Sequence, residues 1–151
     1  QNVFGPRQDP EGAYAAVIPK WFSALLRAEP VFINGDGETS RDFCFITNVV
    51  QANILAAKTT NSNAISQIYN VALGDRTTLN ELFGLICGSV ASLSPKLAKT
   101  KPVYRKFRDG DVRHSHANID KIRSCLGYEP THRVVDGLSE VTAYYLKNVD
   151  F

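Results

Sequence analysis

Residues 34–43 read NGDGETSRDF, a glycine-rich stretch that stands between two short apolar segments. Residues 30–34 are predicted to form one strand, and residues 41–45 a second strand that pairs with it like a hairpin. Gly35 and Gly37 supply the positive φ angles that a tight turn needs. A dinucleotide-binding turn would instead join a strand to a helix, so that backbone donors meet the pyrophosphate. The stretch therefore predicts a turn rather than a phosphate cradle, and no other part of the sequence has that strand, glycine turn and helix order.

Short helices and strands alternate on both sides of this turn. Apolar residues at helical spacing predict a helix over residues 14–26, and Asn48 is expected to cap a second helix. Residues 68–72 are predicted to form a strand, after which Thr78 and Glu81 have the spacing of a capping box for a third helix.

The C-terminal third continues the same pattern. Residues 103–107 alternate as an exposed strand would, and Gly127 is expected to end a short helix. A terminal helix is predicted from a stripe of apolar residues, Val134, Leu138, Val141 and Tyr145. The sequence thus predicts one mixed α/β unit over residues 1–151, built of short strands and helices, without a doubly wound dinucleotide-binding sheet.

Composition narrows the class of protein. The 151 residues are 44% hydrophobic and 21% charged, which is the balance of one soluble domain. A net charge of +2, with dispersed Lys and Arg, favours neither a nucleic acid nor a membrane as partner. The three cysteines are spaced far apart among apolar residues, which indicates buried, reduced thiols in a cytoplasmic protein. The three histidines lack the spacing of metal ligands, so no metal site is predicted.

Three stretches together carry a resemblance to a known family. They are NVFGPRQDP at residues 2–10, NGDGETSRDF at residues 34–43, and RDGDVRHS at residues 108–115. In this order and spacing, they resemble the C-terminal, substrate-binding part of extended short-chain dehydrogenase/reductase enzymes of the NAD-dependent epimerase/dehydratase family. Within that family the sequence is most similar to bacterial UDP-N-acetylglucosamine 4-epimerases that supply surface polysaccharides, and a uronic-acid 4-epimerase remains the alternative.

The resemblance implies an enzyme that holds NAD tightly. In such enzymes a tyrosine base removes the C4 hydroxyl proton, and hydride moves to the nicotinamide and back. The glycine-rich turn and the Tyr-x-x-x-Lys pair of the family would precede Gln1, and Tyr144 with Lys147 has the wrong spacing to replace that pair. The N-terminal NAD-binding half is therefore expected to be absent. The parent enzyme is expected to form a homodimer through that half, and this chain alone to be inactive.

The resemblance also implies substrate contacts for particular residues. Arg41 and Arg108 would bind the two phosphates of UDP, Asp111 would accept hydrogen bonds from the ribose hydroxyls, and Asn2 would contact the phosphates. For Arg41, the alternative is a surface ion pair with Asp42, and for Asp111 it is a role in the turn.

The remaining contacts concern the base and the sugar. Ala16 and Val17 would contact the uridine, and Phe32 and Asn34 would lie along the base, although core packing is the alternative for Val17.

Gln8 would hydrogen-bond an N-acetylated sugar, with a solvated loop position as the alternative. Ser115 is small at a position where a larger residue would exclude the N-acetyl group.

Three hypotheses of function follow. The first is the substrate-binding half of a UDP-N-acetylhexosamine or uronic-acid 4-epimerase, and the second is a non-catalytic nucleotide-sugar binding module. The third is the same portion of a dehydratase or decarboxylase that acts on a similar substrate. All three predict weak UDP binding at Arg41, Arg108 and Asp111. None predicts NAD binding or turnover by this chain alone.

Overall fold

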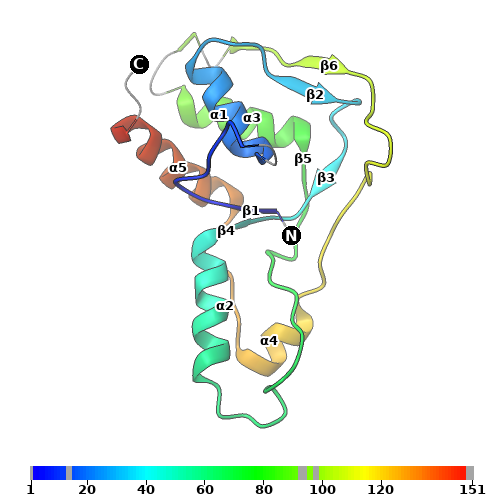
Figure 1. Ribbon diagram of the computed structural model, residues 1–151, viewed down its shortest axis with the longest axis vertical. Coiled ribbons are helices and arrows are strands. Elements are labelled where there is room, and N and C mark those ends of the chain that lie inside the picture. The colour runs from blue at the N-terminus through cyan, green and yellow to red at the C-terminus, as the bar shows by residue number, and fades with distance from the viewer. Residues whose placement is uncertain (1, 13–14, 92–94, 97–98, 149–151) are drawn as a thin grey trace.

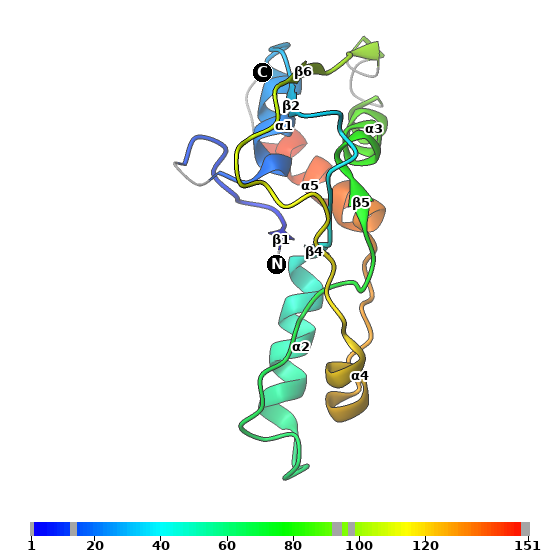
Figure 2. The same ribbon diagram turned by 90° about the vertical axis from the view of Figure 1, so that its right-hand side faces the viewer.

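The computed structural model describes residues 2–12, 15–91, 95–96 and 99–148, which form an elongated molecule (Figure 1). Helices α1, α3 and α5 gather at one end, and α2 and α4 lie side by side at the other end (Figures 1 and 2). In chain order, the elements are β1 (Asn2–Phe4), α1 (Val17–Leu26), β2 (Phe32–Asn34), β3 (Ser40–Arg41), β4 (Phe43–Phe45), α2 (Ile46–Lys58), β5 (Thr77–Thr78), α3 (Leu79–Val90), β6 (Val103–Arg105), α4 (Asp120–Leu126) and α5 (Val134–Asn148).

The described strands form three separate two-stranded sheets. β1 runs parallel to β4, β2 runs parallel to β6, and β3 runs antiparallel to β5. The predicted mixture of short strands and short helices is confirmed. Among the described residues no sheet has more than two strands, so the pocket described below depends on loops and helix ends as much as on strands.

The predicted hairpin around the glycine-rich turn is wrong in its pairing. Gly35 and Gly37 do adopt positive φ angles of 80° and 79°, but the strands on either side pair with different partners. The strand before the turn, β2, pairs with β6, and the N–H of Gly35 donates to the carbonyl of Arg105 at 2.8 Å. After the turn, Asp42 is buried and accepts hydrogen bonds from the backbone N–H groups of Leu73 and Gly74 at 2.9 and 3.0 Å. This interaction separates residues 40–41 from residues 43–45, which therefore join different sheets.

Two further predictions are also wrong. Helix α2 begins at Ile46, so Asn48 lies inside the helix rather than capping it. Its buried side chain donates to the carbonyl of His132 at 2.8 Å and accepts from the N–H of Thr131 at 2.9 Å, which ties α2 to the segment before α5. Residues 68–72 form no strand, and Ile68 is 89% exposed.

The helix signals in the second half of the chain are confirmed. Thr78 accepts from the N–H of Glu81 at 3.1 Å, and the Glu81 carboxylate accepts from the N–H of Thr78 at 2.7 Å, which completes the capping box of α3. Gly127 ends α4 in the left-handed region with φ 67°. The apolar stripe of α5 is buried, and β6 is exposed as predicted. Helix α1 begins at Val17, and Tyr14 lies outside the described residues.

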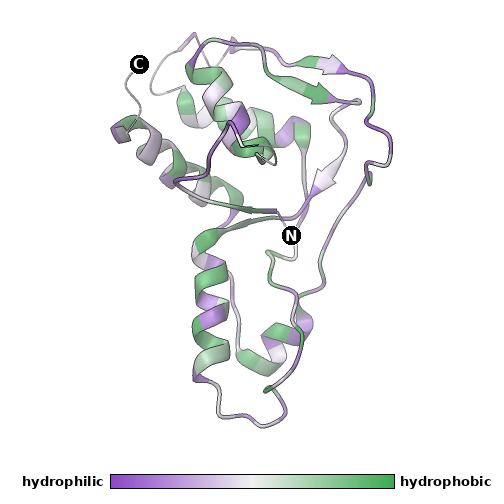
Figure 3. Ribbon diagram, in the orientation of Figure 1, coloured by the Kyte–Doolittle hydropathy of each residue, from purple (hydrophilic) through white to green (hydrophobic). Residues whose placement is uncertain are grey.

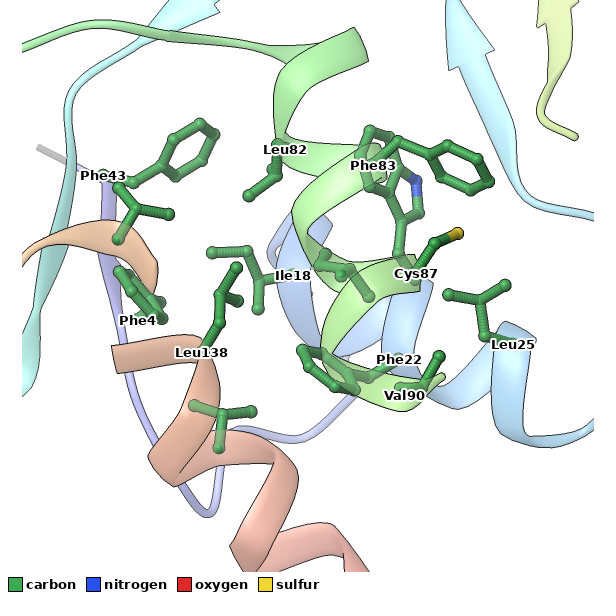
Figure 4. Close-up of a cluster of buried hydrophobic side chains, with 14 of the residues drawn as sticks. Phe4, Ile18, Phe22, Leu25, Phe43, Leu82, Phe83, Cys87, Val90 and Leu138 are labelled. Atoms are coloured by element: carbon green, nitrogen blue, oxygen red, sulfur yellow. The ribbon is translucent and has the colours of Figure 1, made fainter. Parts of the chain in front are cut away.

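The main hydrophobic core joins the three helices at one end of the molecule. Side chains of α1 pack against α3 and α5 and against the phenylalanines of β1 and β4 (Figure 4). A smaller cluster under α2 and α4 contains Ile122, Leu126 and Tyr128. By contrast, the long segment between β6 and α4 is mostly hydrophilic (Figure 3). Burial raises the pKa of the thiols of Cys44 and Cys87, both of which are buried. No helix of the described ranges has the length and apolar character that crossing a membrane requires.

Candidate functional site

A cavity of about 310 Å³ opens where β1, α1, β2, β3 and the segment after β6 meet. Its volume lies at the lower end of the range for small-molecule pockets. Most of the residues predicted to bind substrate line it, namely Asn2, Ala16, Val17, Phe32, Asn34, Arg41, Arg108 and Asp111. The fold therefore brings together residues that are more than 100 positions apart in the sequence.

Arg41 is held at the wall of this cavity by three acceptors. Its Nη2 atom lies 2.6 Å from Oδ1 of Asp111, and Nη1 donates to the carbonyls of Ser40 at 2.9 Å and Arg113 at 3.4 Å. The side chains of Arg41 and Asp111 are 18% and 33% exposed, so the ion pair is only partly screened by solvent. The alternative pairing of Arg41 with Asp42 is wrong, because Asp42 binds backbone N–H groups instead.

Arg108 adds a second guanidinium group to the same cavity. Its side chain makes no hydrogen bond or ion pair with the described residues, whereas its carbonyl accepts from the N–H of Asp111 at 3.2 Å. That backbone bond supports the predicted turn at Asp111 and directs both residues toward the cavity. Arg108 is thus available to an anion without first losing a carboxylate partner.

The N-terminus of α1 also faces the cavity. Ala16 is its N-cap and offers no side-chain acceptor, and the first turn has no acidic residue. Pro19 has no N–H and Lys20 N donates to Ala16 O. The amides of Val17 and Ile18 are the donors of this helix start that have no partner among the described residues. Helix N-termini of this kind attract anions, because orphan N–H groups and the helix dipole both favour negative charge. The wall therefore combines a helix start with two arginines.

An aromatic wall completes the cavity on another side. Phe32 on β2 is 38% exposed, and the guanidinium carbon of Arg105 lies 3.2 Å from its ring centroid. Trp21, the single tryptophan of the chain, also lines the cavity and packs edge-on against Phe83 at 5.9 Å between ring centroids. A planar ligand such as a nucleobase would suit an aromatic wall of this kind.

Two predicted substrate residues do not line this cavity. Gln8 is half-buried and ties its own loop together: its Oε1 accepts from the N–H of Gly5, and its Nε2 donates to the carbonyl of Val3, both at 3.3 Å. Ser115 is exposed, and its N–H donates to the carbonyl of Ser40 at 3.1 Å. The sugar-binding roles of Gln8 and Ser115 stay predictions.

Several lining residues were not predicted as site residues from the sequence, and Lys20, Trp21, Thr39 and Leu79 are among them. Lys20 and Trp21 follow Ala16 and Val17 by one helical turn, so the helical spacing of the segment could have found them. Thr39 and Leu79 are joined by a hydrogen bond from Leu79 N to Thr39 O at 3.0 Å. This contact joins segments 40 residues apart, so it could not be predicted from neighbouring residues in the sequence.

Gly5, Gly35 and Gly37 do not form a dinucleotide cradle. Gly5 follows β1, but a side chain there would meet Cγ2 of Ile46 at 2.6 Å, so close packing against α2 explains this glycine. At Gly35 the same substitution would meet the ring of Phe107, and at Gly37 it would meet the side chain of Asn80. Since protein side chains fill the space beside each of these three glycines, the residues around them do not fit a pyrophosphate. We therefore assign no NAD-binding step to them.

Comparisons with known proteins show which proteins this chain is similar to. Residues 1–72 match the model of the NAD dependent epimerase/dehydratase family. This part of the chain is therefore similar to the epimerases and dehydratases of that family, whose cofactor is NAD. The predicted cofactor is thus confirmed for the family.

The chain is also similar to individual epimerases, including two of known structure. The chain is 33% identical to UDP-glucose 4-epimerase of Mycolicibacterium smegmatis over 95% of this chain and 43% of that protein. Among solved structures, it is 36% identical to UDP-glucose 4-epimerase of Thermotoga maritima with UDP-glucose, with a TM-score of 0.84 over 99% of this chain and 45% of the other. It is 37% identical to UDP-N-acetylglucosamine 4-epimerase of Methanobrevibacter ruminantium in complex with UDP-N-acetylmuramic acid, with a TM-score of 0.85 over 98% of this chain and 44% of the other.

These matches show that the chain has the α/β fold found in members of the family. They also show that the chain spans less than half the length of the relatives it matches. The predicted position at the C-terminal end of the family's proteins is not confirmed by them.

Proposed function

We propose that this chain binds the UDP moiety of a nucleotide sugar and supplies the substrate-binding portion of an NAD-dependent UDP-N-acetylglucosamine 4-epimerase. One observation carries the proposal: Arg41, Arg108 and Asp111 meet the start of α1 and the Phe32 ring in a single cavity. Cations and free backbone amides suit a diphosphate, a carboxylate suits the hydroxyls of a ribose, and an aromatic ring suits a base.

Binding of UDP would exchange the partners of the Arg41–Asp111 pair. The diphosphate offers Arg41 two negative charges in place of one carboxylate, and the two ribose hydroxyls offer Asp111 two donors in place of the guanidinium. Because both residues regain a partner, breaking the ion pair costs little overall. The pair would thus keep both side chains ordered at the cavity wall until the nucleotide arrives.

The charge of the cavity favours a neutral sugar. Lys20, Arg41 and Arg108 line it with positive charge, and Asp111 is its one acidic residue among those described. Two net positive charges match the two negative charges of the diphosphate and leave none for a sugar carboxylate. This balance supports an N-acetylhexosamine over a uronic acid, and it agrees with the interpretation of residues 2–10 and 108–115 given above.

NAD and the catalytic tyrosine would come from the rest of the longer protein, because the residues described here hold neither. The residues of this chain would orient the nucleotide so that the sugar reaches the cofactor, and binding would be the only step they perform. A role in surface polysaccharide supply, a cytoplasmic location and a homodimer formed through another part of the protein stay predictions.

Ligand titration of the purified chain tests the proposal. UDP and UDP-N-acetylglucosamine should quench the fluorescence of Trp21 and release heat in calorimetry, whereas UDP-glucuronic acid should bind more weakly. Absence of UDP binding at millimolar concentration and low salt would contradict the proposed site. Tighter binding of UDP-glucuronic acid would favour the uronic-acid enzyme instead.

A second experiment separates the three hypotheses of function in the longer protein. Incubation with UDP-N-acetylglucosamine and NAD should yield the C4 epimer, detected by NMR of the sugar protons. A 4-keto-6-deoxy product or released carbon dioxide would identify a dehydratase or decarboxylase. Binding without any product would identify a binding module.

A further inference from the structure

The contact between Arg105 and Phe32 lies beside the cavity and has no role in the function proposed above. The guanidinium carbon lies 3.2 Å from the ring centroid, within the range of a strong cation–π contact. Phe32 lines the cavity and Arg105 does not, so the guanidinium lies outside the space that a ligand would fill. Arg105 thus acts on the cavity only through the ring.

The pairing of β2 with β6 explains why the two side chains meet. Phe32 lies opposite Val103 and Asn34 lies opposite Arg105, so Arg105 is the diagonal neighbour of Phe32 across the parallel pair. Long side chains reach diagonal neighbours on one face of a sheet. The N–H of Gly35 also donates to the carbonyl of Arg105 at 2.8 Å, which fixes the end of β6 to the turn after β2. The backbone therefore holds Arg105 in place to stack on the ring.

Phe32 depends on this contact for its orientation. Its ring is 38% exposed, unlike the buried phenylalanines of β1 and β4, so core packing restrains it only in part. Arg105 makes no ion pair with the described residues, which leaves its guanidinium to the ring. The stacked guanidinium restricts the ring to one orientation before any ligand binds.

We propose that Arg105 is a positioning residue of the nucleotide pocket, which holds the Phe32 ring in the orientation that packs against the nucleobase. This inference rests on the proposed function, since it needs a base beside Phe32. It predicts that Arg105 contributes to the binding of uridine and UDP and contributes nothing to the binding of inorganic pyrophosphate. A direct phosphate contact would predict the reverse.

The experiment measures dissociation constants for UDP, uridine and inorganic pyrophosphate with the wild type, Arg105→Ala, Arg105→Lys and Phe32→Ala. Arg105→Ala should weaken UDP and uridine about two- to fivefold, as expected from a cation–π contact of this exposure. Arg105→Lys should restore part of the affinity because it keeps a cation over the ring. In a Phe32→Ala background, Arg105→Ala should have no further effect, since the two residues act as one unit.

Arg113→Ala is the matched control. Arg113 carries the same charge and lies over a different ring, Phe107, at 5.6 Å, and neither residue lines the cavity. Its loss reports the general effect of removing one positive charge nearby. An Arg105→Ala effect no larger than that of Arg113→Ala, or one that persists without Phe32, would overturn the inference.

A measurement without ligand separates this inference from the proposed function. The side-chain protons of Arg105 should show an upfield ring-current shift in NMR that Phe32→Leu removes. If that shift is present and UDP does not bind the wild type, the proposed function and the nucleotide role of Arg105 are both wrong. If UDP binds and the shift is absent, only the inference about Arg105 fails.

Discussion

Replacing Arg41 should separate phosphate recognition from the rest of nucleotide binding. Arg41 Nη2 lies 2.6 Å from Asp111, and the Arg41 side chain is only 18% exposed. Charge-assisted hydrogen bonds contribute about 1.5–3 kcal/mol. Breaking the existing pair offsets this by about 0.2–1 kcal/mol, because both side chains are partly exposed. The Arg41→Ala variant should therefore lose about 0.5–2.8 kcal/mol of UDP binding, which is roughly 2- to 100-fold in Kd.

Isothermal titration calorimetry with UDP and with uridine is the assay. Uridine has no phosphate, so its affinity should change less than twofold in Arg41→Ala. Arg27→Ala is the control, because Arg27 forms an exposed ion pair with Glu11 at 3.0 Å outside the cavity and should leave both affinities unchanged. If UDP and uridine lose affinity equally, Arg41 shapes the pocket without contacting the phosphates, and the reasoning is refuted.

Three further predictions concern the scaffold. Thr78→Ala should lower the free energy of unfolding by about 1 kcal/mol in a denaturant titration, because it removes the N-cap of α3; an unchanged midpoint would contradict this. Asn48→Ala should cost at least about 2 kcal/mol by the same measurement, since it removes a buried amide that hydrogen-bonds three backbone groups of residues 131 and 132; a loss no larger than that of Thr78→Ala would count against it. The hydrogen bond from Arg113 holds the pKa of Asp36 below its ordinary value of 3.8, so this pair stabilises the fold above about pH 4 and loses its effect as the pH falls through the lowered pKa. In an NMR titration, Arg113→Ala should raise the pKa of Asp36, and an unchanged value would show that the backbone N–H of residue 38 sets it instead.

Features encoded in neighbouring residues could be predicted from the sequence. The Thr78–Glu81 capping box, the glycine turn and the end of α4 each depend on residues within a few positions, and the structure has all three. Strand pairing could not be predicted in this way, because strands of two or three residues carry no pattern that selects a partner. The apolar run at residues 68–72 was predicted as a strand on composition alone, yet it belongs to none of the strands in the described part of the chain.

The candidate site likewise has features that could be predicted from short motifs and features that depend on the folded chain. The resemblance assigned substrate contacts to ten residues, and eight of them line one cavity of the folded chain. It did not reveal that Arg41 and Asp111 bind each other, since residues 70 positions apart meet only in the folded chain.

The location of Arg41 depends on polar contacts rather than on an extensive sheet. β3 contains only Ser40 and Arg41, so its pairing with β5 supplies few hydrogen bonds. On one side of Arg41, the buried carboxylate of Asp42 binds two backbone N–H groups, and on the other the carbonyl of Ser40 accepts from the Arg41 side chain. A carboxylate at position 42 therefore has a structural role, and the neighbouring guanidinium lines the cavity, where it pairs with Asp111. This division explains why an adjacent Arg and Asp, which in sequence look like an ion pair, act on opposite sides of the strand, one in the core and one in the cavity.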